Sequence, residues 1–149
     1  MSTRESGIAL REINDNDLAK IIAGHELWLD SGGSDGARAD LSYSTWRAID
    51  WSSAYFVGAD LSGADLRGAD MRGVDLRSVD LRDTDLRDTD LSNTNLIGVD
   101  LRGANLDGAY LRGAKLDGAY LRGAKLDGAH LRGAWIDGPI FDDDTDTTA

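Results

Sequence analysis

The sequence predicts a repeat solenoid that follows a single helix. An apolar residue recurs at every fifth position, without an insertion, from Leu41 to Phe141. An α-helix turns ~100° per residue, so a spacing of five would spread these residues over all of its sides. A flat strand would place successive members on opposite faces, because five is an odd number. The chain must therefore turn a corner once in every repeat.

The composition is that of an ordinary soluble domain. The chain has 149 residues, of which 41% are hydrophobic and 29% are charged, and it has no cysteine. It also lacks an apolar run of ~18 residues and a charged-then-apolar amino terminus. Disulfides, a membrane partner and export are therefore unsupported, and we expect a cytoplasmic protein.

Residues 1–38 are expected to form a cap on the first coil of the solenoid. Asn14 and Asp15 are both good N-cap residues. They precede apolar and aromatic residues at helical spacing, namely Leu18, Ile21, Ile22, His25, Trp28 and Leu29. This pattern predicts a helix over about residues 16–30. Because an open solenoid end needs a cover, we expect the helix to lie against the first coil.

The repeats are expected to occupy residues 39–141. If the apolar centre is called i, position i−2 is small or short-branched, and position i−1 is polar and usually Asp. Segments such as ADLSG, VDLRS, TDLRD and ANLDG follow the pattern A(D/N)LxG. This pattern resembles that of the pentapeptide-repeat family.

The resemblance implies an all-β solenoid, a right-handed quadrilateral β-helix of about five coils with an N-terminal capping α-helix. Each coil would contain four repeats, with the residues at i and i−2 facing inward. Trp46 and Trp51 are unusual occupants of position i. Either the first coil is wider than the others, or one tryptophan turns outward against the helix.

The carboxyl-terminal end of the solenoid has no cap in the sequence. Residues 142–149, DDDTDTTA, are too short and polar to fold and are expected to be a disordered acidic tail. The apolar residues before the tail would be left in water: Trp135, Ile136, Ile140 and Phe141. Gyrase-directed members of the family dimerise through their C-terminal coils, so the resemblance implies a homodimer through this end. A tail that folds back is the alternative.

Outward side chains are expected to form columns, because positions twenty apart stack on one face at ~4.8 Å. A partner-facing acidic group is predicted at Asp60, Asp65, Asp70, Asp75, Asp80, Asp83, Asp85, Asp88, Asp90 and Asp100. Arginines two residues after several of these aspartates would relieve the repulsion between them. A solvated surface that neutralises itself is therefore the alternative to a binding face.

Beyond residue 101, outward aromatic and basic residues recur with a period of ten at positions i−1 and i+1. They are Tyr110, Arg112, Tyr120, Arg122, His130 and Arg132. Exposed aromatic residues beside arginine are typical of protein interfaces. The alternative is that this pattern records a recent duplication and has no function.

These features predict a non-enzymatic scaffold that binds a protein partner of unknown identity through its outward columns. The family includes quinolone-resistance proteins that are thought to mimic DNA, so a partial DNA mimic that binds gyrase or another DNA-binding protein is an alternative. Duplex DNA carries ~2.8 negative charges per 4.8 Å. Residues 41–100 hold eleven Asp and six Arg, a net charge of −5 over three coils. A structural component of a phage particle or other assembly is a third possibility.

The sequence gives no support for catalysis, for a metal or for another cofactor. The two histidines, His25 and His130, have no acid partner in the pattern. Neither an EF-hand loop nor a nine-residue calcium repeat is present. Direct binding to nucleic acid is disfavoured by the net charge of −11.

Overall fold

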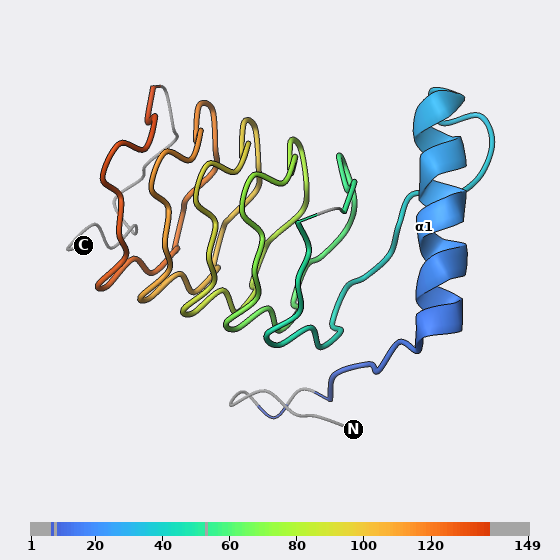
Figure 1. The fold of residues 1–149 in the computed structure, drawn as a ribbon, viewed down its shortest axis with the longest axis horizontal. Helices are drawn as coiled ribbons and strands as arrows, with labels where there is room; N and C mark the ends of the chain where they lie inside the picture. The colour runs from blue at the N-terminus through green and yellow to red at the C-terminus, as the bar shows by residue number, and fades with distance from the viewer. Residues whose placement is uncertain (1–6, 8, 53, 138–149) are drawn as a thin grey trace.

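The computed structural model describes residues 7, 9–52 and 54–137. These residues form one helix, α1 (Asp15–Asp30), followed by a rod of stacked coils. Helix α1 lies across one end of the rod, and the described chain ends at the other (Figure 1). No helix within these residues is long and apolar enough to cross a membrane.

The ends of α1 follow from local chemistry. The side-chain oxygen of Asn14 accepts a hydrogen bond from the Asp17 amide at 2.9 Å, which satisfies one of the unpaired donors of the first turn. At the other end, the Ser31 amide donates to the Leu27 carbonyl at 3.0 Å. Gly32 then takes a φ of 66°, which ends the helix at little steric cost. The helix begins one residue before the predicted range and ends where that range ends.

Parallel bridges join each coil to the next at a register of twenty residues. One column of bridges runs from Asp60 to Asp80 and from Asp80 to Asp100, and similar columns lie on the other sides of the coil. The Leu61 amide donates to the Asp80 carbonyl at 2.9 Å, and the Asp80 amide donates to the Ala59 carbonyl at 3.0 Å. The bridges are isolated because a corner follows every side. The period of five thus produces a four-sided coil.

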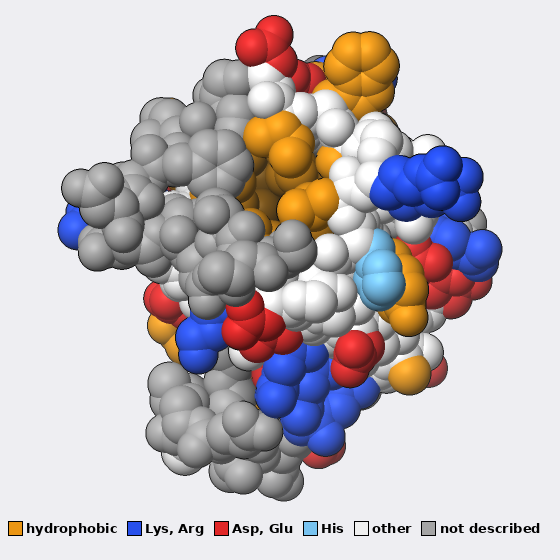
Figure 2. All heavy atoms as spheres, turned by 90° about the vertical axis from the view of Figure 1, so that its left-hand side faces the viewer, with side chains coloured by type: hydrophobic (Ala, Val, Ile, Leu, Met, Phe, Trp, Pro, Cys, Tyr) orange, Lys and Arg blue, Asp and Glu red, His pale blue; other side chains and the backbone are white. Residues whose placement is uncertain are grey.

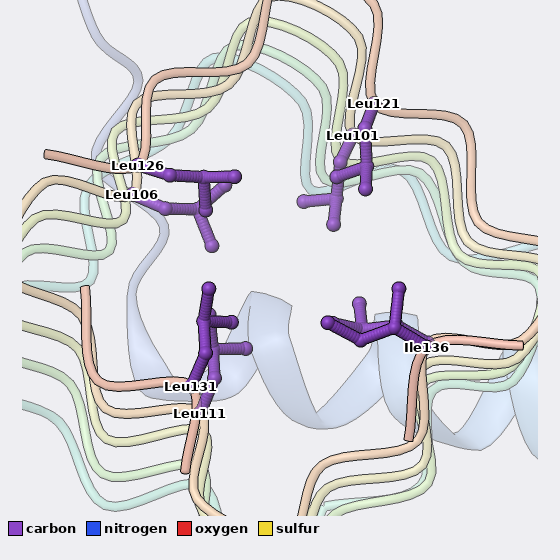
Figure 3. Close-up of a pocket in the computed structure, with 8 residues that line it drawn as sticks. Leu101, Leu106, Leu111, Leu121, Leu126, Leu131 and Ile136 are labelled. Carbon is purple, nitrogen blue, oxygen red and sulfur yellow. The ribbon is translucent and has the colours of Figure 1, made fainter. Parts of the chain in front are cut away.

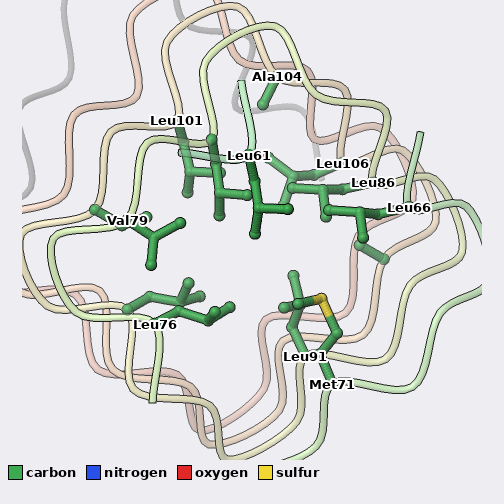
Figure 4. Packing of buried hydrophobic residues seen from close by; sticks show 14 of the residues in the cluster. Leu61, Leu66, Met71, Leu76, Val79, Leu86, Leu91, Leu101, Ala104 and Leu106 are labelled. Atoms are coloured by element: carbon green, nitrogen blue, oxygen red, sulfur yellow. The ribbon is translucent and has the colours of Figure 1, made fainter. Parts of the chain in front are cut away.

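The interior of the rod is filled by residues from positions i and i−2 (Figure 4). The central leucines from Leu61 to Leu106, together with Met71, are fully buried. The inward threonines satisfy their hydroxyl groups with main-chain oxygens. Thr89, for example, donates to the Leu66 carbonyl at 2.8 Å. The core therefore combines close apolar packing with few unpaired polar atoms.

Both tryptophans at position i of the first coil point inward. Trp46 is 6% exposed and Trp51 is 4% exposed. Their rings meet edge to face with a centroid distance of 5.1 Å, and Trp51 makes a similar contact with Phe56 at 4.9 Å. The possibility that one of these tryptophans turns outward is therefore wrong.

Helix α1 closes the first coil through an apolar and aromatic contact. Leu18, Ile21 and Ile22 pack against the core of the rod. His25 is buried, and its Nδ1 accepts a hydrogen bond from the Ala39 amide at 3.1 Å. The His25 ring also stacks on Trp28 at 5.5 Å and on Phe56 at 6.5 Å, the last being a residue of the rod.

Candidate functional site

Most of the predicted acidic columns are bound by arginine from the same coil. Nε of Arg82 donates to one carboxylate oxygen of Asp80 at 2.9 Å, and Nη2 donates to the other at 2.6 Å. We call this two-point contact a fork. The same fork joins Asp65 to Arg67, Asp70 to Arg72, Asp75 to Arg77, Asp85 to Arg87 and Asp100 to Arg102.

The forks follow from the geometry of one side of the coil. Positions i−1 and i+1 are two residues apart, so both side chains point outward from the same short extended segment. The arginine also approaches the aspartate of the next coil, as in the 3.8 Å contact between Arg82 and Asp100. Hydrogen bonds from the Arg77 guanidinium hold the pKa of Asp75 below its usual value. Each fork therefore presents a neutralised pair to the solvent.

Asp65 is not a partner-facing carboxylate, and its prediction as one is wrong. Its side chain is only 1% exposed. Arg47 contacts it from the preceding coil at 2.6 Å, and Arg67 contacts it from its own coil at 2.8 Å. Two arginines therefore cover the Asp65 carboxylate, whereas each of the other forked aspartates has one fork partner.

Asp83 and Asp88 are exposed and lie at corners of the coil. Both have a left-handed backbone, with φ values of 57° and 58°, at position i+2, where most repeats have glycine. Among the predicted column members without a fork, Asp60 accepts hydrogen bonds from Ser62, and Asp90 accepts one from the Ser92 amide. The predicted acidic group therefore exposes fewer free carboxylates than its number of aspartates indicates.

The basic and aromatic residues separate onto two sides of the rod. Tyr110 and His130 continue the column that contains Asp70 and Asp90. Their rings stack with a centroid distance of 4.7 Å and an interplanar angle of 5°. Tyr120 instead continues the column of Asp80 and Asp100, on the opposite side of the four-sided coil. The structure thus brings Tyr110, Arg112, His130 and Arg132 together and places Tyr120 and Arg122 apart from them.

Tyr120 has a basic neighbour from the preceding coil. The guanidinium of Arg102, one coil earlier, lies 5.8 Å from the centre of the Tyr120 ring, within the range of a cation–π contact. Arg102 is also held in a fork by Asp100. The sequence prediction did not include Arg102, although its position two residues after Asp100 indicated the fork.

The C-terminal end of the rod is apolar and hollow. A cavity of about 150 Å³ opens there, and aliphatic side chains line it (Figure 3): Leu101, Leu106, Leu111, Leu116, Leu121, Leu126, Leu131 and Ile136. Figure 2 shows this apolar hollow, with Lys, Arg, Asp and Glu side chains farther out on the same face. Trp135 is 64% exposed and Ile136 is 41% exposed. Ile140 and Phe141, predicted to belong to the same end, lie outside the described residues.

The sequence prediction missed this cavity, although a signal for it exists. Position i−2 holds Val or Thr from Val74 to Val99 but Ala from Ala104 to Ala134. Alanine fills less of the corner, so the last two coils contain less inward side-chain volume than the segment from Val74 to Val99.

Comparisons with solved structures give several similar proteins. A pentapeptide repeat protein from the thylakoid lumen of Arabidopsis thaliana is 33% identical over 58% of this chain and 64% of its own, with a TM-score of 0.48. HetL from the cyanobacterium Nostoc sp. strain PCC 7120, which is involved in the regulation of heterocyst differentiation, is 33% identical over 72% of this chain and 51% of its own, with a TM-score of 0.41. QnrB1, a plasmid-mediated fluoroquinolone resistance protein, is 21% identical over 74% of this chain and 67% of its own, with a TM-score of 0.49.

The family comparison is more decisive than these individual similarities. A search of curated proteins found no match. The family model for pentapeptide repeats, however, matches residues 37–73, 69–108 and 104–141 with eight copies. The match covers more than half of the chain and coincides with the four-sided coils. The chain therefore belongs to the pentapeptide-repeat family.

Proposed function

We propose that this chain is a rigid, non-enzymatic scaffold that binds a protein partner through the side chains on the outside of its rod. The observation that supports this function is the outward placement of large aromatic residues on a fixed backbone. Tyr110 is 47% exposed, Tyr120 is 43% exposed and Trp135 is 64% exposed. Aromatic side chains that are already held in place lose little entropy on binding and often dominate the energy of an interface.

The backbone beneath these aromatic residues supports the proposed rigidity. The Tyr110 amide donates to the Thr89 carbonyl at 2.9 Å, and the Tyr120 amide donates to the Val99 carbonyl at 2.9 Å. Each residue is thus tied to the preceding coil. A partner that fits the spacing between coils would therefore meet a surface that needs no rearrangement.

Site-specific photo-crosslinking tests this function. A photo-reactive amino acid replaces Tyr120 in the full chain, and the protein is irradiated in a lysate of the source organism. We expect one discrete adduct with a second protein. The matched control replaces Arg77, an outward residue of the acidic coils, and should give no such adduct.

Two results would contradict the proposal. The first is the same mixture of adducts from both positions, which indicates non-specific contact. The second is an adduct from Tyr120 that sediments only with a large particle, which favours the structural-component alternative over a scaffold for a single partner.

A further inference from the structure

We infer that Tyr110, Arg112, His130 and Arg132 bind a short acidic segment of a protein partner. We call these four residues the cationic face. The inference rests on the proposed scaffold function, because it gives the chemical class of a partner for one side of the rod. It is carried by Arg112 and Arg132, which have no carboxylate partner among the described residues.

The unpaired state of these arginines follows from a change at position i−1. Arg72, Arg112 and Arg132 occupy the same column, because the spacings between them are multiples of twenty residues. Arg72 is held by Asp70, with contacts of 2.9 and 2.6 Å. Tyr110 and His130 take the corresponding aspartate positions before Arg112 and Arg132. Within residues 54–137, neither of these two guanidinium groups has an ion-pair or hydrogen-bond partner.

The arrangement of the four side chains suits an extended acidic peptide. Arg112 and Arg132 are both exposed and belong to neighbouring coils, ~4.8 Å apart along the rod. Each guanidinium can bind a carboxylate with two parallel hydrogen bonds. The stacked rings of Tyr110 and His130 lie beside them and offer apolar contact. Lys115, three residues after Arg112, is also exposed and adds a cation on the next side of the coil.

The rest of the column limits the length of the ligand. Asp90 and Asp70 precede Tyr110 in this column, and residues 41–100 carry a net charge of −5. A long polyanion such as a nucleic acid strand would extend over these carboxylates and be repelled. A protein segment can confine its acidic residues to the two coils of the cationic face. The distribution of charge therefore favours an acidic peptide over a nucleic acid.

Binding of a defined peptide to the full chain tests the inference. The probe is a fluorescent eight-residue peptide of alternating Glu and Ser with one Tyr, measured by fluorescence anisotropy. We expect binding that weakens as salt is raised. Tyr110→Asp should weaken it about tenfold or more. The new carboxylate at position 110 would hold Arg112 in a fork, as Asp70 holds Arg72, although the arginine itself remains.

The matched control is Arg72→Ala, which also makes the net charge of the same column more negative by one. Because Asp70 already occupies Arg72, this change should leave peptide affinity unchanged. Tyr110→Asp should fold normally, since aspartate occupies the same column position at Asp50, Asp70 and Asp90; circular dichroism checks this. Equal affinity of wild type and Tyr110→Asp, or equal weakening by Arg72→Ala, would overturn the inference.

Two further measurements separate other occupants. Tighter binding of a twelve-nucleotide oligo-dT than of the peptide would overturn the assignment to protein. A second variant changes the four aspartates of residues 142–146 to asparagine. If the peptide binds only this variant, the chain's own acidic segment is the occupant, and the inference of a separate partner is overturned. Absence of peptide binding together with a Tyr120 crosslink would leave the scaffold function standing and reject only the cationic face.

Discussion

The residue at position i−1 decides whether the arginine two residues later is held in a fork. An aspartate two residues earlier draws the guanidinium into a fork, as at Asp80 and Arg82. Where Tyr110 takes that position, the Arg112 guanidinium has no ion-pair or hydrogen-bond partner among the described residues. The backbone is the same in both repeats, so the difference lies entirely in side-chain chemistry.

The contribution of a fork to the free energy of unfolding should increase with the burial of its carboxylate. Asp65→Ala removes a carboxylate that is 1% exposed and is bound by Arg47 and Arg67. We expect it to lower the free energy of unfolding by about 1.5–3 kcal/mol, the range for hydrogen bonds to charged groups. Asp75→Ala removes a more exposed fork and should cost less than about 1 kcal/mol. Urea unfolding checks both values, and equal losses would show that burial of Asp65 has no energetic consequence.

His25 should make the stability of the cap depend on pH. Burial lowers the pKa of His25 from its ordinary value of 6.5. The unfolded chain therefore takes up a proton near pH 6.5, while the folded chain does so only at lower pH. The contribution of neutral His25 is fully present above that pH. It is lost progressively as the pH falls towards the folded pKa.

The matched variant for this prediction is His25→Asn. It offers an acceptor to the Ala39 amide and does not titrate. Thermal unfolding between about pH 7 and pH 5 should show a steeper decline for the wild type than for the variant. Parallel declines would show that His25 is not the titrating group.

At the scale of elements, the contact between α1 and the loop after it depends on one glycine. Gly36 has a φ of 73°, and a Cβ at this position would lie 2.8 Å from the Trp28 amide nitrogen and closer still to the Gly24 carbonyl. These are backbone atoms of α1, so they cannot move aside without distorting the helix. Gly32 also has a left-handed backbone, but a Cβ there would meet nothing within 4 Å.

Gly36→Ala should therefore destabilise the cap more than Gly32→Ala. The left-handed backbone alone costs ~1–2 kcal/mol with a side chain, and both variants carry that cost. The clash with α1 adds to it only at Gly36. Limited proteolysis should cut residues 31–38 faster in Gly36→Ala than in Gly32→Ala. Equal cleavage rates would show that the loop can move away from α1 at little cost.

The elements differ in how far the sequence could predict them. The coils were predictable because the same five-residue period sets every side of each coil. The buried residues at position i, from Leu61 to Leu106, follow that period throughout. The range of α1 was predictable from its caps. The burial of Asp65 was not, because it requires Arg47 of the preceding coil to fold over it. The stacking of Tyr110 on His130 could be anticipated from the register, whereas the unpaired state of Arg112 required the side-chain geometry.

At the scale of the whole molecule, the charge of the rod changes sign along its axis. Residues 41–100 carry −5, while residues 101–140, with four Asp, four Arg and two Lys, carry +2. Duplex DNA would present ~2.8 negative charges for every coil rise of 4.8 Å along its whole length. The arginines counted in this net charge are bound in forks to carboxylates such as Asp70 and Asp80.

This distribution leads us to expect no effect on DNA gyrase. Purified protein in micromolar excess should neither inhibit DNA supercoiling nor protect gyrase from a quinolone, because a DNA mimic needs a continuous negative surface. A DNA supercoiling assay checks this expectation. Inhibition that disappears when exposed carboxylates such as Asp83 and Asp88 are changed to asparagine would contradict it and favour the DNA-mimic alternative.

The hollow C-terminal end leads to a proposal about assembly, a homodimer that forms end to end. Ile136 and Leu131 border an apolar cavity at this end, and burying such surface against a second copy is favourable. Ile136→Asp should therefore shift the protein to monomers in sedimentation equilibrium, whereas Tyr120→Asp, on a side of the rod, should leave dimers intact. A wild type that remains at 16.0 kDa up to high micromolar concentration would contradict the proposal.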